Sequence, residues 1–350
     1  MTDLRTLLGI ELPLIQAPMA GVQGSRLAIA VSNAGALGSL PCAMLSVDAM
    51  RGELAEIRAH TSRPFNVNFF CHEAPVPDPE REVSWRRRLE PYYRELGLDA
   101  RAIPSASGRS PFSAEAADAL AEFSPAVVSF HFGLPSEELL SRVRSFGSKI
   151  FSSATTIEEA VWLEDHGADV IIAQGLEAGG HRGLFLSADL SGQAGTFSLL
   201  LGILNTVRVP VVAAGGIADA EGVAAAMAAG AAGVQIGTAY LLCPEATTSP
   251  VHRAALKSAA AGDTAVTNVF TGRPARGIVN RAMREIGPMS GEAPAFPLAA
   301  TAMAPLRAAA EGRGSGDFSP LWAGQNAPAC REIPAAELTR ELAARLGLAV

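Results

Sequence analysis

The sequence has few charged and few aromatic residues, and it has no long apolar run. Of its 350 residues 18% are charged and 6% are aromatic, whereas 49% are hydrophobic. This balance excludes the low-hydrophobicity, high-charge composition of disordered chains and allows a large core. A membrane helix needs roughly 20 consecutive apolar residues, and the Ala-rich stretch GVAAAMAAGAAGV is interrupted by Gly230 and Gly233. We therefore expect a soluble globular protein that does not enter a membrane.

Three further features are missing. The N-terminal stretch MTDLRTLLGIELP lacks the apolar segment of a secretory signal, which predicts a cytoplasmic protein. The four cysteines form no CxxC pair and have no regular spacing, so we expect reduced thiols and neither a disulfide frame nor a metal site. The formal net charge of -7 disfavours a broad nucleic-acid-binding surface.

Short apolar runs recur along the chain, and most of them are followed by a segment with helical spacing of its apolar residues. The expected strands are 12–19, 36–40, 65–70, 126–132, 149–154, 169–174, 209–215 and 233–239. Eight strand-then-helix units in about 240 residues predict an α/β fold of the (β/α)8 type, a TIM barrel. A doubly wound open sheet is the alternative, which eight units disfavour.

Two parts of the chain exceed a minimal barrel spanning residues 1–242. An insertion at 71–125 follows the third strand, and we expect it to lie over the active face. Residues 243–315 are expected to form a small helical cap domain, with helical patterns at 250–261 and 274–286. Residues 316–350 are expected to return to the barrel and to end in a helix.

Glycines and a hydroxyl mark the ends of the last two barrel strands. Gly215 and Gly216 precede a helix that opens near Asp219, and Gly237 and Thr238 end the following strand. Barrel enzymes often bind a phosphate between these two loops, where backbone amides and a helix N-terminus face an anion. The pattern favours a phosphate site, and two tight turns that need glycine for their own geometry are the alternative.

Amide side chains lie in or at the end of three expected strands. Asn68, Gln174 and Gln235 would each be costly to bury without a hydrogen-bond partner. Amides of this kind suit the donor and acceptor edge of a heterocycle, although each one alone could be a satisfied structural group. Around one phosphate site the three favour a nucleotide-like cofactor.

His131 lies in SFHFG, at the end of the fourth expected strand and between two phenylalanines. An imidazole in an apolar pocket can act as a general base near neutral pH. The alternative is a core histidine bonded to a carbonyl group. His252, at the start of an expected helix of the cap, is expected at the surface.

The stretch QGLEAGGHRG combines adjacent glycines with a polar pair. Gly179 and Gly180 allow the backbone to approach something flat. His181 could be catalytic or could contact a cofactor. Arg182 could bind an anionic substrate or pair with Glu177.

The segments QAPM, NAGALGSL, NVNFF, SFHFG, AQGLEAGGHRG, AAGGIAD and VQIGTAYL, in this order, resemble the FMN-dependent nitronate monooxygenases, formerly called 2-nitropropane dioxygenases. DFSPLWAGQ, residues 317–325, resembles a further segment of the bacterial class that has SFHFG. The resemblance implies FMN-dependent oxidation of alkyl nitronates, and of nitroalkanes where the enzyme can deprotonate them, by dioxygen to a carbonyl compound and nitrite. Such an activity would serve nitroalkane detoxification, in a monomer or a homodimer.

The resemblance also implies roles for individual residues. The flavin ring would be lined by Ala17, Pro18, Met19, Asn68, Gln174, Gly179 and Gly180, and its phosphate would be held by Gly215, Gly216, Gly237 and Thr238, with Gln235 nearby. His131 matches the histidine of the family's active site, and His181 and Arg182 would serve the substrate or act secondarily. The segment AIPSASGRSPF stands where we would look for an aromatic residue that lines the substrate pocket, and this departure leaves the substrate preference open.

Other activities are possible on the same barrel, because fold does not fix substrate. An NAD(P)H-dependent flavin oxidoreductase of the quinone reductase or enoyl-acyl-carrier-protein reductase type shares glycine-rich flavin loops. A non-catalytic barrel that binds a phosphate ligand would keep those loops but would give no reason for His131.

Overall fold

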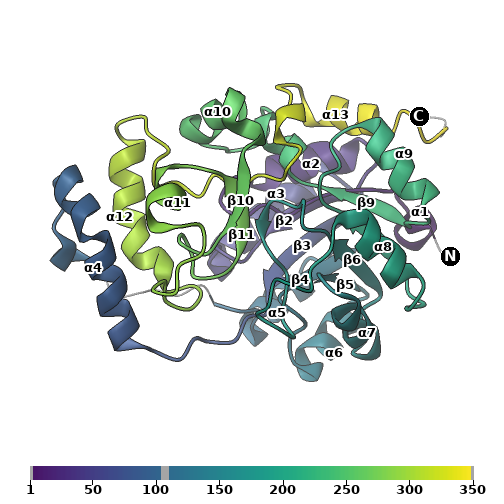
Figure 1. Ribbon diagram of the computed structural model, residues 1–350. Coiled ribbons are helices and arrows are strands. Elements are labelled where there is room, and N and C mark those ends of the chain that lie inside the picture. Colours follow the sequence, from purple (N-terminus) through teal and green to yellow (C-terminus); the bar gives the residue numbers. More distant parts are fainter. Residues whose placement is uncertain (1–2, 104–109, 348–350) are drawn as a thin grey trace.

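The structure is a computed structural model that describes residues 3–103 and 110–347, and its centre is a closed ring of eight parallel strands (Figure 1). In chain order the strands are β1 (Leu14–Gln16), β2 (Gly38–Pro41), β3 (Phe65–Phe70), β4 (Val127–His131), β5 (Lys149–Ala154), β6 (Val170–Gln174), β8 (Val211–Ala214) and β9 (Gly233–Ile236). Neighbours pair in the order β1-β9-β8-β6-β5-β4-β3-β2, and a bridge between Ile15 and Leu37 closes the ring. The predicted TIM barrel is confirmed.

Helices cover the outside of this barrel, and several of them start at a side-chain cap. After α1 (Leu4–Leu8) they are α2 (Ser25–Asn33), α3 (Val47–His60), α5 (Ala114–Ala121), α6 (Glu137–Ser145), α7 (Ile157–Asp165), α8 (Thr196–Leu204) and α9 (Ala220–Ala228). Ser46, Ser136 and Asp219 each accept a hydrogen bond from a backbone amide of the first helical turn. Such a side chain satisfies an amide that has no partner within the helix.

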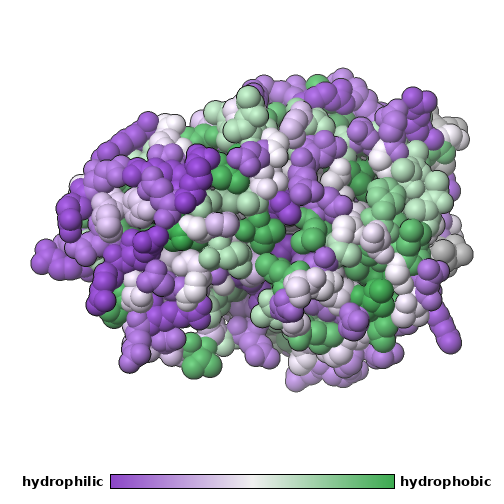
Figure 2. Space-filling view, viewed as in Figure 1, coloured by the Kyte–Doolittle hydropathy of each residue, from purple (hydrophilic) through white to green (hydrophobic). Residues whose placement is uncertain are grey.

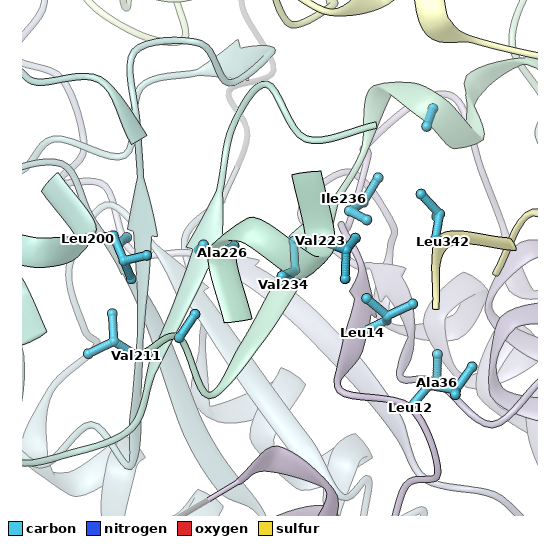
Figure 3. Packing of buried hydrophobic residues seen from close by; sticks show 14 of the residues in the cluster. Leu12, Leu14, Ala36, Leu200, Val211, Val223, Ala226, Val234, Ile236 and Leu342 are labelled. Atoms are coloured by element: carbon cyan, nitrogen blue, oxygen red, sulfur yellow. The ribbon is translucent and has the colours of Figure 1, made fainter. Parts of the chain in front are cut away.

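The largest apolar cluster lies between strands and helices of the barrel and extends from β5 and β6 through β8 and β9 to β1. Val211 of β8 and Val234 of β9 pack there with Leu200 of α8 and Val223 of α9 (Figure 3). A second set of side chains, including Phe151 and Val212, forms a separate cluster of strand residues. Strand residues alternate between the two faces of a sheet, so β8 supplies Val211 to the first cluster and Val212 to the second.

The segment after the barrel contains strands as well as helices, which corrects the expectation of a helical cap. Its elements are η2 (Thr238–Leu242), α10 (Pro250–Leu256), η3 (Ala259–Gly262), β10 (Thr264–Thr267), β11 (Ala275–Ile278), α11 (Arg281–Ile286) and α12 (Ala299–Glu311). The helix expected at 274–286 begins only at Arg281, because Ala275–Ile278 pair with β10 and with β7 (Gly180–His181) in a three-stranded sheet. This pairing depends on a barrel loop distant in the sequence, which local spacing does not reveal.

The insertion after β3 also differs from expectation. Its helix α4 (Pro79–Leu96), which is followed by η1 (Ala100–Ala102), packs beside α12 at one side of the molecule (Figure 1). Trp85 and Leu89 share a buried cluster with Met303 and Leu306. The apolar face of α4 is thus covered by the cap, and this helix does not lie over the strand ends as expected.

The C-terminal part crosses the cap and then reaches the barrel. A bridge joins Trp322 to Gly277 of β11, and η4 (Ala327–Ala329) follows. The last helix, α13 (Ala335–Leu342), contacts α2 and α9, and the Thr339 hydroxyl lies 2.9 Å from the Tyr240 hydroxyl. The division into a barrel, a cap and a returning segment stays a prediction.

The surface differs between the two sides of the molecule. Figure 2 shows mainly hydrophilic residues over α4 and α12, and more hydrophobic ones where α8 and α9 lie. Phe197 and Leu201 of α8 are 42% and 48% exposed. The state of the protein as a monomer or a homodimer stays a prediction. None of the helices described is both long and apolar enough to cross a membrane.

Candidate active site

A single cavity at the carboxyl ends of the strands brings the predicted site residues together. The strand register begins this arrangement, because Gln174 lies opposite Ala214, and Ala214 opposite Gln235. On the other side of the ring Asn68 lies opposite Ser129. The predicted residues that line the cavity are Ala17, Pro18, Met19, Asn68, His131, Gln174, Gly179, Gly180, His181, Gly215, Gly216, Gln235, Gly237 and Thr238. Arg182 is the predicted residue that does not line it.

The glycines of this cavity have no room or no suitable backbone conformation for a side chain. Gly215 and Gly216 have φ angles of +127° and +70°, which other residues rarely adopt. A Cβ atom on Gly179 would lie 2.5 Å from the backbone nitrogen of Gly324. The walls are therefore bare backbone at the end of β8 and in the loop after β6. Such walls fit a phosphate and a flat ring, as a flavin requires.

The three predicted amides differ in how they are bonded. The Oε1 atom of Gln235 is buried and has no hydrogen-bond partner among the described residues, which leaves an acceptor for a bound donor. Asn68 donates to the Ser129 hydroxyl at 2.9 Å. Gln174 donates to the His181 carbonyl oxygen at 2.9 Å and accepts from the Gly183 amide at 2.7 Å. Gln174 therefore shapes the loop as well as lining the cavity.

His131 is buried in the wall with both ring nitrogens engaged. Its Nδ1 lies 3.1 Å from the Ser153 hydroxyl, and its Nε2 lies 3.1 Å from the carbonyl oxygen of His181. A carbonyl oxygen can only accept, so Nε2 carries the hydrogen and Nδ1 accepts from Ser153. Burial lowers the pKa of His131 to about 4, and the nearby positive charge of Arg273 acts in the same direction. The ring is neutral at pH 7.

His181 stands on the short strand β7, where the loop after β6 meets the cap. Its Nε2 lies 2.9 Å from the hydroxyl of Thr271, a buried cap residue. The rings of His181 and Trp322 have centroids 5.5 Å apart. The cap thus contributes directly to the surroundings of this histidine.

The structure corrects both predictions for Arg182. The side chain is fully buried, and its Nη1 and Nη2 donate to the carbonyl oxygens of Gly175 and Gln174 at 2.6 and 2.7 Å. Glu177 instead accepts from the Thr196 amide at 2.8 Å and forms no ion pair with Arg182. Arg182 therefore braces the loop that carries the glycines and is not available to a substrate.

His252 is a second correction, because it is 4% exposed and lines the same cavity. Burial lowers its pKa to about 4, and a hydrogen bond to the backbone of Trp322 acts in the opposite direction. The cap and the C-terminal segment cover this residue, although its position at a helix start favoured the surface.

Several residues that line the cavity were not predicted from the sequence, namely Phe70, Ser129, Ser153, Trp322, Gly324 and Asn326. The Gly324 amide donates to the Thr238 hydroxyl at 3.0 Å, and the Asn326 amide donates to the Gly216 carbonyl oxygen at 3.2 Å. The C-terminal part of the chain, through Gly324 and Asn326, thus holds both loops of the expected phosphate site. The run WAGQN, residues 322–326, could have marked three of them as site residues, because it combines a glycine with two amides. It overlaps the segment DFSPLWAGQ that carries part of the family resemblance.

The segment AIPSASGRSPF, where we looked for an aromatic residue of the pocket, lies partly outside the described residues. Its last residue, Phe112, is buried against Phe69 and Phe130, with ring centroids at 4.7 and 5.3 Å. Phe112 therefore belongs to the barrel core. Phe70 of β3 supplies an aromatic wall of the cavity instead.

The sequence of this chain is similar to those of known enzymes. A model of the nitronate monooxygenase family matches residues 2–345. A nitronate monooxygenase from Pseudomonas aeruginosa is 42% identical over 353 residues, covering 99% of each chain. Another from Paraburkholderia phytofirmans is 42% identical over 343 residues, covering 96% of this chain and 92% of the relative.

Solved structures give the same grouping. Nitroalkane oxidase from Streptomyces ansochromogenes superimposes with a TM-score of 0.89 at 40% identity, covering 98% of this chain and 97% of the other. FabK from Thermotoga maritima superimposes with a TM-score of 0.73 at 29% identity, covering 98% and 94%. The similarity extends over the barrel, the cap and the tail alike.

Proposed function

The chain belongs to the nitronate monooxygenase family, and from this premise we propose that it uses FMN and dioxygen to oxidise alkyl nitronates to a carbonyl compound and nitrite. It is an oxidoreductase of a flavin-dependent family, and its family and its structural relatives support oxidation of nitronates or nitroalkanes. FMN, the nitrite product and a role in cytoplasmic nitroalkane detoxification are the parts that we propose.

One observation carries the proposal: a bare-backbone cradle and a neutral histidine line the same cavity. Gly215 and Gly216, with Gly237 and Thr238, would hold the phosphate of FMN. The flat backbone near Gly179 would lie against the ring. Bound FMN would supply the electron acceptor that amino-acid side chains lack.

The flavin ring would have further neighbours in the cavity wall. The residues proposed to line it are Ala17, Pro18, Met19, Asn68, Gln174 and Gly180. The unpartnered acceptor of Gln235 would meet a donor on the bound cofactor. Each proposed contact comes from a strand end or from the loop after β6, so the barrel fixes them relative to one another.

The state of His131 favours the nitronate over the neutral nitroalkane. A general base works best with a pKa near the operating pH, whereas burial lowers that of His131 to about 4. Its Nδ1 already accepts from Ser153, and its Nε2 already donates to the His181 carbonyl oxygen. We propose that the neutral His131 ring is a fixed face of the wall against which a substrate that arrives deprotonated is positioned, and that His181 contacts the same substrate.

The test begins with the absorbance spectrum of the purified protein, in which we expect bound oxidised flavin. The holoenzyme is then mixed with propyl nitronate, 1-nitropropane or NADH in aerated buffer, and oxygen uptake and nitrite are measured. We expect oxygen uptake with nitrite from the nitronate. A colourless protein would indicate a phosphate-binding barrel, and rapid flavin reduction by NADH without nitrite would indicate a reductase.

A further inference from the structure

The described residues that line the cavity include no Asp, Glu, Lys or Arg, although the proposed substrate is an anion. Charged groups lie one layer behind the wall instead. Arg182 and Arg276 are buried, and Arg273 is partly buried, around the loop after β6. Within residues 3–103 and 110–347, none of the three has a carboxylate oxygen within 4 Å. Their charges are therefore not cancelled by direct ion pairs.

Two of these arginines are occupied in bracing the loop. Arg182 donates to two carbonyl oxygens at the end of β6, as described above. Arg276 donates from Nε to the Leu176 carbonyl oxygen at 2.8 Å and from Nη1 to Thr264. Both guanidinium groups thus hold backbone in place.

Arg273 is placed differently. Its guanidinium carbon lies 3.9 Å from the centroid of the Phe132 ring, and its Nη2 donates to the Leu184 carbonyl oxygen. Its Nε is buried without a hydrogen-bond partner among the described residues. A guanidinium group stacked on an aromatic face remains charged while it is shielded from water.

Phe132 lies between the Arg273 guanidinium group and His131. It follows His131 directly, and the two rings have centroids 4.6 Å apart. Its φ angle of 71° is unusual for a bulky residue, a conformation that persists only where the surroundings enforce it. Arg273 covers one face of this ring, while Phe70 and Phe296 contact it at 4.9 and 5.6 Å.

The carboxylate that acts on Arg273 forms no direct ion pair with it. Glu159 is the carboxylate whose charge acts on Arg273. Its oxygens accept from the Thr155 and Phe185 amides, both at 2.7 Å. Arg273 and Arg182, both positive, are the charges that act on His131. Glu159 also acts on Arg182, and Glu177 acts on Arg182 and Arg276, so the three guanidinium groups exceed the two carboxylates by one positive charge.

We propose that Arg273, whose charge lies behind Phe132 and His131, determines the preference of the cavity for anionic nitronates over neutral nitro compounds. This inference rests on the proposed function for the identity of the substrate. A partly buried charge behind the wall attracts an anion in a water-poor site and acts hardly at all on a neutral molecule of the same shape. Contact with the substrate is not required.

The test compares Arg273→Gln with Arg273→Lys in the flavin-loaded enzyme. Glutamine retains a donor for the Leu184 carbonyl oxygen but has no charge, and lysine retains the charge. Arg284→Gln is the control, because Arg284 is exposed on the cap helix α11 and its loss changes net charge equally. Dissociation constants of nitrate and of neutral nitromethane are measured, together with KM for propyl nitronate.

For Arg273→Gln we expect about tenfold weaker nitrate binding, about tenfold higher KM for the nitronate and unchanged nitromethane binding. Arg273→Lys should lie within a few-fold of the wild type, and Arg284→Gln should match it. The pKa of His131, followed by NMR, should rise in Arg273→Gln because a positive charge is lost. Equal losses for nitrate and nitromethane, or no loss for either, would overturn the proposal.

Failure of the proposed function gives a different result. A protein that binds nitrate through Arg273 but does not oxidise nitronates would contradict the function and retain the anion site. Should Arg273→Gln not fold, the wild type alone decides, because we expect nitrate to bind at least about tenfold more tightly than nitromethane. Equal binding of the two by the wild type would overturn the proposal.

Discussion

The Nδ1 atom of His131 accepts a hydrogen bond from the hydroxyl of Ser153 at 3.1 Å, while the opposite ring nitrogen donates to a backbone carbonyl oxygen. This pairing satisfies the imidazole completely in its neutral form. A proton added at Nδ1 would have to displace the Ser153 hydrogen and would create a buried charge near Arg273. His131 is therefore a fixed polar group bonded to a carbonyl oxygen, as one of the two interpretations of its sequence position expected, and it also lines the cavity.

Replacing His131 by asparagine tests this assignment. We expect His131→Asn to lower propyl nitronate and 1-nitropropane oxidation by similar factors, because 1-nitropropane then reacts only through the fraction that has already lost its α-proton to the buffer, and the ring positions the same anion in both cases. Loss of a general base would instead lower nitroalkane turnover by about 100-fold to 10,000-fold while sparing the nitronate. Steady-state oxygen uptake with each substrate distinguishes the two outcomes, and the flavin spectrum of the variant checks its folding.

Acid should destabilise the fold through two buried histidines. Burial lowers the pKa values of His131 and His252 from 6.5 to about 4. Between these values the unfolded chain binds protons that the folded chain does not, so the free energy of unfolding decreases as the pH falls. From pH 7 to pH 5 we expect a loss of about 2 kcal/mol for each histidine.

Urea unfolding of the flavin-free protein at the two pH values measures this loss. His252→Asn should reduce the pH dependence by about half, since one of the two groups is gone. His60→Asn serves as the control, because that side chain is exposed. A wild-type stability that does not change over this interval would contradict the buried neutral state of both rings.

Substitution at Gly216 tests the phosphate site. Gly216→Asp would place a carboxylate beside the phosphate of FMN, and we expect the dissociation constant of FMN to increase at least about tenfold from repulsion alone. Gly216→Asn is the matched control, with the same size, the same tolerance of a positive φ angle and no charge. Flavin fluorescence titration measures both. Equal affinities in the two variants would remove the phosphate from this loop.

Much of this arrangement could be predicted from the sequence. The eight strands were recognisable because each is a short apolar run bounded by glycine or a helix cap, and a barrel places all of their ends at one face. The grouping of Asn68, His131, Gly179 and Gly216 in one cavity follows from that topology alone. Local pattern and fold agree most closely in this part of the chain.

The remaining features depend on contacts between distant parts of the chain, which the spacing of residues in the sequence does not reveal. The acceptors of Arg182 are carbonyl oxygens, which every residue has, so no sequence pattern marks them. The burial of His252 and the strand at Ala275–Ile278 both arise where the cap meets the barrel loop. The position of α4 follows from an apolar face that could have packed on either the barrel or the cap.

The cap residue Thr271 offers a final test, because its hydroxyl lies 2.9 Å from Nε2 of His181 and 3.4 Å from the Arg273 carbonyl oxygen. Thr271 can donate to that carbonyl oxygen and accept from Nε2, which would fix the tautomer of His181. Thr271→Val retains the shape but loses the hydroxyl, and we expect kcat/KM for propyl nitronate to fall about tenfold. Thr271→Ser should restore it. The pH dependence of kcat/KM should change in the valine variant alone, while the flavin spectrum stays constant. Identical pH profiles in all three proteins would leave Thr271 as a packing residue.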